Sequence, residues 1–557
     1  MRRPPALALI AALLAAGALG AAAGRADTSR PLLVAAGPAH ERSDRVGGGF
    51  RRVTFSPDGD GRDDAVTIRV RASQGDRLSL RINPISRSAF SLPGPVAAAG
   101  VTQLRWDGIQ PNGKRYPDGS YALAVCDTAT HACSHERVLA HLRLITTFVQ
   151  QLATGVDPGA DLRVNVSSDL AGPFTIDVVA AGSSAPGLGA VDVAHAGWVH
   201  FTVPDVPHGG LWLLRVRDGD AVDHFPLVVH EPSLTLDDPP AHTALVVYPW
   251  LTWRAYDIFD ENRDGIVDSW YSHPRNPVDP LYGPFEIAPK TPAEEGREPN
   301  PQSQDAFAQW LAAHTLVAQH VTDVELASLP ADVIHKYAAV VFEGHTEYYL
   351  RAEYDKMASY RAAGGRLYFF QGNPFYGEAQ IVGDQVWRRS YRYRTPQRSD
   401  FGLTGVGFRA CCWPPRIKPL YHLAAGAVER LPWAFAGTGL RDGDRFGVAA
   451  GEVDTTNAKL SPPGTFAVAT AIVPKYEPTS EKETLGWIGS KPIPYEPSWV
   501  KPRRIVIAYA AVGSGEVFTW ANTGFLKTVR FGGYGLSARE RAQLDRVALN
   551  VWERFAR

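Results

Sequence analysis

Two apolar runs of this sequence end in polar side chains that could act together on a substrate. The first run leads directly to His345 and Glu347, and the second ends at Asn373. The residues between them have helical spacing, so the segment 338–373 is predicted to form a strand, a helix and a strand. Because open parallel sheets bind ligands at the carboxyl ends of their strands, the three side chains are expected to converge. Together they could bind a cation, move a proton or stabilise a developing negative charge.

Each of these residues also has a purely structural interpretation. A single histidine after a strand is often held by ordinary hydrogen bonds, and Asn373, which precedes Pro374, is a natural turn former. The strand pattern therefore predicts that these side chains lie close together, but it does not by itself assign them a chemical role.

A second candidate site is an acidic loop that begins at Asp260. Oxygen-bearing side chains stand at its positions 1, 3, 5 and 9, and a glycine at position 6 permits a tight turn. This pattern is typical of Ca²⁺ loops, although position 12 is Tyr271 where a bidentate glutamate is usual. The expected Ca²⁺ ligands are Asp260, Asn262, Asp264, the backbone of Ile266, and Asp268. A solvated acidic turn is the alternative.

The elements that would position these sites fall into three folded units. Short alternating runs separated by Gly, Pro and Asn-Gly predict an immunoglobulin-like β-sandwich over residues 27–146 and a second β-sandwich over 147–236. From 237 to 557 strands alternate with helices, and one helix is predicted over 306–321. The fold class is therefore multidomain, two all-β sandwiches followed by an α/β domain with a largely parallel sheet.

Charge and targeting signals limit the classes of function. Lys and Arg number 57 against 58 Asp and Glu in 557 residues, so no large field would attract nucleic acid or an anionic membrane. Arg2 and Arg3 precede an Ala/Leu-rich run, which predicts a signal peptide over residues 1–26. We expect a secreted, cell-surface or periplasmic protein that is not attached to a membrane after cleavage; an uncleaved anchor is the alternative.

Export would also permit disulfides. Cys126 and Cys133 flank a short turn between two strand-like runs and are predicted to form a disulfide. Cys411 and Cys412 are adjacent, which leaves packed thiols or a vicinal bridge as the alternatives.

Four motifs between residue 241 and the end of the chain resemble one known family. In chain order they are TWRAY at 252–256, GHTEY at 344–348 with GGRLYFFQGN at 364–373, GEVD at 451–454, and GSGEVF at 513–518. They are similar to motifs of the C-terminal domain of the large (beta) subunit of N,N-dimethylformamidase. The resemblance implies a flavodoxin-like or glutamine-amidotransferase-like core and hydrolysis of a linear amide C–N bond in a small-molecule or peptide-like amide substrate.

The resemblance also implies a metal centre. In that family two tyrosinates and one glutamate bind a mononuclear Fe(III), and Tyr256 and Glu347 match two of these ligands. The third counterpart is Tyr282, with Tyr271 as its rival. Phenolate and carboxylate are hard ligands that suit a trivalent ion.

Catalytic roles follow from the same resemblance. Glu452 matches the glutamate that takes a proton from water and passes it to the leaving amine. His345 and Asn373 would orient the substrate or stabilise the oxyanion.

The N-terminal half supports a competing hypothesis. FSPDGDG at 55–61 and WDG at 106–108 resemble the immunoglobulin-like module of flagellar hook-capping proteins, in which these motifs are structural. Trp198, His208 and Trp212 in or near turns could contact carbohydrate or a cell surface. The alternative is therefore a non-catalytic binding protein with a degenerate amidase-like domain. Self-association and the need for a second subunit stay open.

Overall fold

The computed structural model describes residues 31–255 and 303–556, apart from short gaps. The gaps are residues 38–44, 47–49, 58–63, 85–89, 111–112, 114, 117–118, 135–136, 143, 150–154, 169, 182–184, 220, 383–384, 392–397, 412, 414–416, 476–486, 489–490, 493–500 and 533–534. Three predictions lie outside the described residues. They are the signal peptide, the calcium loop with its ligands Asp260, Asn262, Asp264, Ile266 and Asp268, and the proposed iron ligands Tyr256, Tyr271 and Tyr282.

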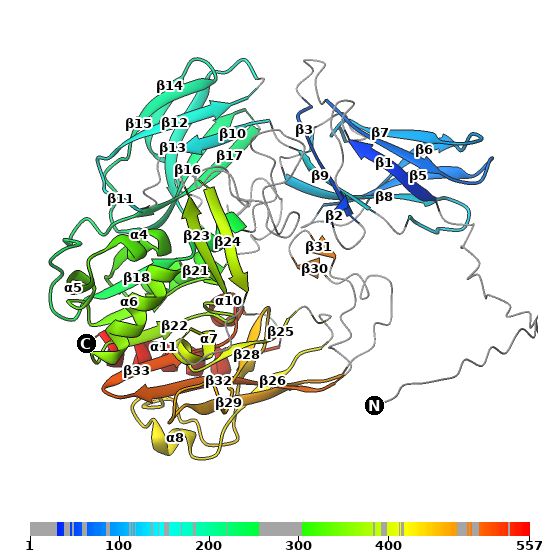
Figure 1. The fold of residues 1–557 in the computed structure, drawn as a ribbon. Coiled ribbons are helices and arrows are strands. Elements are labelled where there is room, and N and C mark those ends of the chain that lie inside the picture. Colours follow the sequence, from blue (N-terminus) through cyan, green and yellow to red (C-terminus); the bar gives the residue numbers. More distant parts are fainter. Residues whose placement is uncertain are drawn as a thin grey trace, which may run out of the picture.

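The first unit is all-β, as predicted (blue in Figure 1). A six-stranded sheet, in the order β2-β3-β9-β8-β5-β6, accompanies a three-stranded sheet, β1-β4-β7. Phe55, Trp106 and Tyr121 pack in its core, with the Trp106 ring 5.1 Å from Phe55 and 5.0 Å from Tyr121. The predicted Cys126–Cys133 disulfide is confirmed. The strands are β1 Leu32–Gly37, β2 Arg45–Val46, β3 Phe50–Phe55, β4 Val66–Arg71, β5 Arg77–Pro84, β6 Phe90–Val96, β7 Thr102–Trp106, β8 Gly119–Asp127 and β9 Arg137–Leu142.

The second unit is also all-β and contacts the C-terminal part of the chain. Its sheets have the orders β10-β12-β15 and β11-β17-β16-β13-β14. The strands are β10 Thr146–Val149, β11 Gly155–Val156, β12 Asp161–Ser167, β13 Phe174–Ala180, β14 Leu188–Val193, β15 Gly197–Thr202, β16 Gly210–Asp218 and β17 Ala221–Val229. His230, just after β17, bridges to Glu325 of the next unit through a 2.8 Å contact from its Nε2 atom.

The C-terminal unit is built on a nine-stranded sheet of order β19-β18-β20-β22-β33-β32-β29-β26-β27. The pairings from β19 to β33 are parallel, whereas those from β33 to β27 are antiparallel. The strands are β18 Ala244–Tyr248, β19 Gln319–Thr322, β20 Ala339–Phe342, β22 Arg366–Phe369, β26 Leu420–Leu423, β27 Arg445–Val448, β29 Phe466–Val473, β32 Arg503–Val512 and β33 Gly515–Thr519.

Helices cover both faces of the parallel half of this sheet. Successive residues of β18, β20 and β22 belong to two different hydrophobic cores, because side chains alternate along a strand. One core includes residues of α4, α5 and α6, and the other includes Trp310 of α3 and Trp552 of α11, whose rings lie 5.7 Å apart. Strands buried on both faces read as continuous apolar runs, which explains ALVVY and AVVF.

Smaller elements complete the unit. The helices are α1 Trp250–Ala255, α3 Ser303–Ala313, α4 Asp323–Ser328, α5 Ala331–Ile334, α6 Arg351–Ala362, α7 Asp400–Thr404, α8 Ala427–Arg430, α10 Phe525–Phe531 and α11 Ala538–Ala556. The remaining strands are β21 Tyr348–Leu350, β23 Gly377–Val382, β24 Gln385–Tyr391, β25 Gly407–Ala410, β28 Val453–Thr455, β30 Trp487–Ile488 and β31 Lys491–Pro492. Within the described part of the chain, no helix combines the length and the apolar character needed to cross a membrane.

The prediction of a single helix over 306–321 is wrong. Helix α3 ends at Ala313, Thr315 adopts a left-handed φ of 51°, and residues from Gln319 onward form β19. Parallel pairing of β19 with β18 buries all four of its residues. Tertiary pairing therefore outweighs the helical spacing of this segment.

Candidate functional site

Two neighbouring parallel strands deliver the first site residues to one edge of the sheet. β20 ends at Phe342 shortly before His345, and β22 ends at Phe369 shortly before Asn373. The Phe370 backbone N–H donates to the Phe342 carbonyl at 3.0 Å, which extends the ladder toward the site. The two loops are then joined because the Thr346 backbone N–H donates to the side-chain oxygen of Gln371.

Glu452 arrives from the antiparallel half of the domain, between β27 and β28. Its backbone N–H donates to Thr523 Oγ1 at 2.8 Å, just beyond the end of β33. The Asn522 side chain accepts from Ala450 N at 3.0 Å and donates to the Val448 carbonyl at 2.9 Å. Residue 372 must be glycine here, because a Cβ atom would lie 2.3 Å from the Glu452 carbonyl oxygen.

These loops bring four of the predicted site residues together. His345 Nε2 lies 3.2 Å from Glu452 Oε2 and 3.8 Å from Glu347 Oε2. One ligand atom from each of these three residues lies within 4.8 Å of the other two. Asn373 Nδ2 donates to Glu452 Oε2 at 2.6 Å, so the amide directly contacts the carboxylate. The expected convergence of His345, Glu347 and Asn373 is thus present in the structure.

The cluster is rich in negative charge. Burial alone would lower the pKa of His345, but the neighbouring carboxylates, Glu452 first and then Glu347 and Asp454, raise this pKa to about 9. The imidazole is therefore protonated at neutral pH in the metal-free chain. Buried carboxylates require a counter-charge, so the cluster is well suited to attract a cation.

The three-residue cluster also has a chemistry suited to a metal. Imidazole nitrogen and carboxylate oxygen atoms bind iron, manganese and zinc, and their spacing around His345 is compatible with a shared ion. The donors present thus fit a metal ion, although donor chemistry by itself selects no single metal.

Asp454 is a further residue of the candidate site, to which the sequence analysis assigned no role. Its carboxylate is fully buried and accepts from the Asn373 backbone N–H at 2.9 and 3.1 Å. This contact stabilises Asn373 in a left-handed conformation with φ of 55° and so directs its amide toward Glu452. The signal available in the sequence was the position of Asp454 in the GEVD motif at 451–454, two residues after Glu452.

Helix α1 attaches the TWRAY segment to the cluster. The Tyr348 backbone N–H, next to Glu347, donates to Thr252 Oγ1 at 3.1 Å. At the N-terminus of the same helix, the Asp323 carboxylate accepts from the Leu251 N–H at 3.1 Å. α1 ends at Ala255, so the described part of the TWRAY segment, residues 252–255, is fixed beside Glu347.

Residues 185–530 match the family model described as N,N-dimethylformamidase beta subunit-like, C-terminal. The chain belongs to this family. The match begins between β13 and β14, inside the second β unit, and thus earlier than the motifs that start near residue 241. The family's name indicates an amide hydrolase as the general class of activity for this dimethylformamidase-like chain.

Other comparisons describe strand-rich neighbours. The dimethylformamidase-like chain is similar to a chimeric titin Z1Z2-Z1Z2 tandem, with 11% identity and a TM-score of 0.18 over 30% of this chain and 88% of that chain. It is also similar to the N-terminal four Ig domains of Dscam1 isoform 4.4, with 11% identity and a TM-score of 0.13 over 34% and 47% of the two chains. A third similar structure is that of the chicken CNTN1 FN1-FN3 domains, with 9% identity and a TM-score of 0.13 over 36% of this chain and 66% of that chain. No match was found among curated proteins. Likeness at this level does not extend to function.

Proposed function

We propose that this protein is an exported amidase that hydrolyses the C–N bond of a small or peptide-like amide with the help of a bound metal. The observation that carries the proposal is the cluster of His345, Glu347 and Glu452 at the carboxyl ends of the parallel strands. It lies inside the segment that matches the dimethylformamidase-like family. A flavodoxin-like or glutamine-amidotransferase-like core belongs to the same proposal, supported by helices on both faces of the parallel strands.

The proposed metal is a single Fe(III), with Glu347 and Tyr256 as two ligands and Tyr282, or its rival Tyr271, as the third. When bound, the ion would act as a Lewis acid toward the amide carbonyl and would lower the pKa of a water molecule. Glu347 is well placed for this task, because it is 4% exposed and the strand that follows it is fixed by Thr252.

The remaining residues have separate roles in the proposal. Glu452 takes a proton from the attacking water at Oε2 and returns it to the leaving nitrogen. Asn373 orients that carboxylate through its 2.6 Å hydrogen bond, and Asp454 in turn holds Asn373. His345, whose Nε2 lies 3.2 Å from Glu452 Oε2, orients the substrate or stabilises the oxyanion that develops on its carbonyl.

Two variants separate the proposed roles of the carboxylates. We expect Glu347→Gln to purify without iron and without the tyrosinate charge-transfer colour, since a ligand is lost. Glu452→Gln should retain iron and colour but lose hydrolysis by roughly 10²- to 10⁴-fold, the usual contribution of general base catalysis. Metal content is measured by plasma mass spectrometry and activity on a panel of small amides.

Three outcomes would change the proposal. Full iron in Glu347→Gln would remove that residue from the ligand set, and loss of iron in Glu452→Gln would make Glu452 a ligand. Wild-type protein with no transition metal and no amide hydrolysis would favour the non-catalytic alternative. That alternative is supported by the aromatic side chain of Trp198 in β15, which is 47% exposed.

Calcium at Asp260–Asp268 and cleavage after residue 26 complete the proposal. The supporting observation for calcium is the oxygen-ligand spacing of the sequence. We expect EGTA to lower the thermal unfolding temperature of the exported protein and added Ca²⁺ to restore it. An unchanged temperature would contradict the calcium site.

A further inference from the structure

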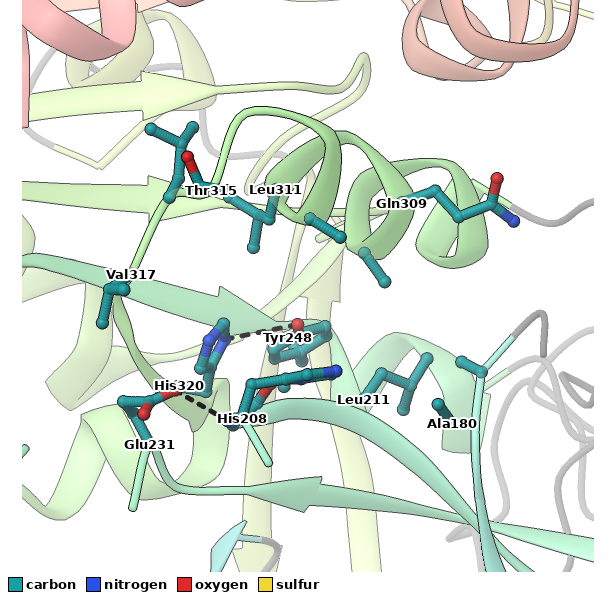
Figure 2. Close-up of a pocket in the computed structure, with 16 residues that line it drawn as sticks. Ala180, His208, Leu211, Glu231, Tyr248, Gln309, Leu311, Thr315, Val317 and His320 are labelled. Atoms are coloured by element: carbon teal, nitrogen blue, oxygen red, sulfur yellow. Dashed lines mark hydrogen bonds between the residues drawn. The ribbon is translucent and has the colours of Figure 1, made fainter. Parts of the chain in front are cut away.

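A cavity lies away from the carboxylate cluster, between the second β unit and the C-terminal unit (Figure 2). Its volume is about 470 Å³, within the range of small-molecule sites, and ligand pockets occur preferentially at such domain boundaries. None of His345, Glu347, Asn373 and Glu452 lines it. Any ligand it holds therefore occupies a site distinct from the proposed active site.

One wall of the cavity is apolar. Ala308, Leu311 and Ala312 of α3 present one helix face, because residues three and four apart lie on the same side. On the side that faces α3, Leu211 of β16 and Ala180 of β13 add further apolar surface (Figure 2). These side chains can receive the apolar body of a ligand.

The opposite wall offers hydrogen-bond acceptors. His320 is 3% exposed, and burial together with His208 and His230 lowers its pKa to about 3, so its imidazole is neutral. His208 Nδ1 donates to the Gly209 carbonyl at 2.8 Å, which fixes the ring beside the cavity. Tyr248 adds its hydroxyl, 3.4 Å from His320 Nδ1.

Glu231 supplies negative charge to this wall. Its carboxylate is 7% exposed and accepts from the Gly209 N–H at 2.8 Å and from the Ser233 hydroxyl at 2.7 Å, both uncharged donors. Among the described residues that line the cavity there is no lysine or arginine. A cation would therefore be attracted and an anion repelled.

The polar wall depends on a close approach of the two units. A Cβ atom on residue 209 would lie 2.6 Å from Glu231 N and 2.8 Å from the His320 ring, so only glycine fits. The Glu231 backbone N–H also donates to Gln319 Oε1 at 2.7 Å, next to His320. These contacts hold the acceptors of both units on one surface.

We propose that this cavity binds a small organic ammonium ion, with its N–H groups toward Glu231 and His320 and its apolar body against α3. This binding site is separate from the proposed amide hydrolysis, and binding there requires neither the metal nor Glu452.

Isothermal titration of the full chain with three probes of similar shape tests the proposed charge preference. We expect benzylamine to bind, benzyl alcohol to bind at least tenfold more weakly, and benzoate to give no heat. A tenfold loss corresponds to about 1.4 kcal/mol. Benzoate that binds as well as benzylamine, or benzylamine that gives no heat at millimolar concentration, would overturn the proposal.

A matched pair of variants on α3 tests the location. Ala312 and Ala313 are both exposed, but only Ala312 lines the cavity. Ala312→Trp should weaken benzylamine binding at least tenfold, whereas Ala313→Trp should bind like wild type. Equal affinity in the two variants would place binding elsewhere. Glu231→Gln, if it folds, should abolish the preference for benzylamine over benzyl alcohol; the Ala312/Ala313 pair decides the location in either case.

Discussion

Asn373 allows the side-chain and backbone contributions to the cluster to be separated. Its amide donates to Glu452 at 2.6 Å, its backbone has φ of 55°, and it is 2% exposed. Asn373→Gly removes the amide but tolerates this φ, so it should lose about 1.5–3 kcal/mol, the worth of a hydrogen bond to a charged group. Asn373→Ala loses the same bond and adds left-handed strain of about 1–2 kcal/mol.

Urea-induced unfolding at pH 7 measures these differences in the free energy of unfolding. The expected order of stability is wild type, then Asn373→Gly, then Asn373→Ala. Equal stability of the Gly and Ala variants would refute the backbone argument. A Gly variant as stable as wild type would show that the bond to Glu452 contributes nothing. Asn373→Asp, which keeps side-chain size, should be less stable than wild type above about pH 5, because two carboxylates then face each other.

Two further predictions concern pH. Burial, and then the charge of Asp323, raise the pKa of Glu353 well above its usual value. The folded state therefore keeps a proton that the unfolded chain releases, and the contribution of Glu353 to stability should fall by about 1.4 kcal/mol per pH unit above about pH 4.3 until that pKa is reached. Glu353→Gln should gain stability relative to wild type as pH rises from 5 to 8 in urea unfolding; a constant difference would contradict the prediction. Burial would lower the pKa of His230, but Glu325 and then Asp157 raise it to about 9. The contribution of protonated His230 to the free energy of unfolding should be complete below about pH 6.5 and lost between pH 6.5 and 9. Because Asp157 is 77% exposed, we expect about 1–2 kcal/mol. His230→Gln should remove that pH dependence, and an identical pH profile would exclude the bridge as a stabilising contact.

Site residues whose position depends on nearby sequence could be predicted, whereas residues held by partners distant in the sequence could not. His345 and Asn373 follow adjacent parallel strands, so the strand-end rule alone placed them together. Glu452 is 79 residues from its partner Asn373, and no local pattern connects them; only the family resemblance predicted its place. The buried Asp454 likewise owes its role to a partner distant in sequence.

The same distinction explains the fold. Alternating runs in the first two units predicted all-β structure, because exposure alternates with burial along their strands, as in β4 and β7. The segment after Ala313 was misread because its apolar spacing is compatible with a helix, whereas pairing with β18 selects a strand. The coupling of Glu353 to Asp323 also could not be predicted, since it depends on the packing of α4 against α6.

The origin of Glu452 in the antiparallel half has a consequence for biosynthesis. The ribosome releases His345, Glu347 and Asn373 well before Glu452, and the latter is fixed only when Thr523 follows β33 into the sheet. Contacts of such long sequence separation form slowly and late. A nascent or truncated chain therefore carries an incomplete cluster, which becomes complete only after the last third of the polypeptide has folded.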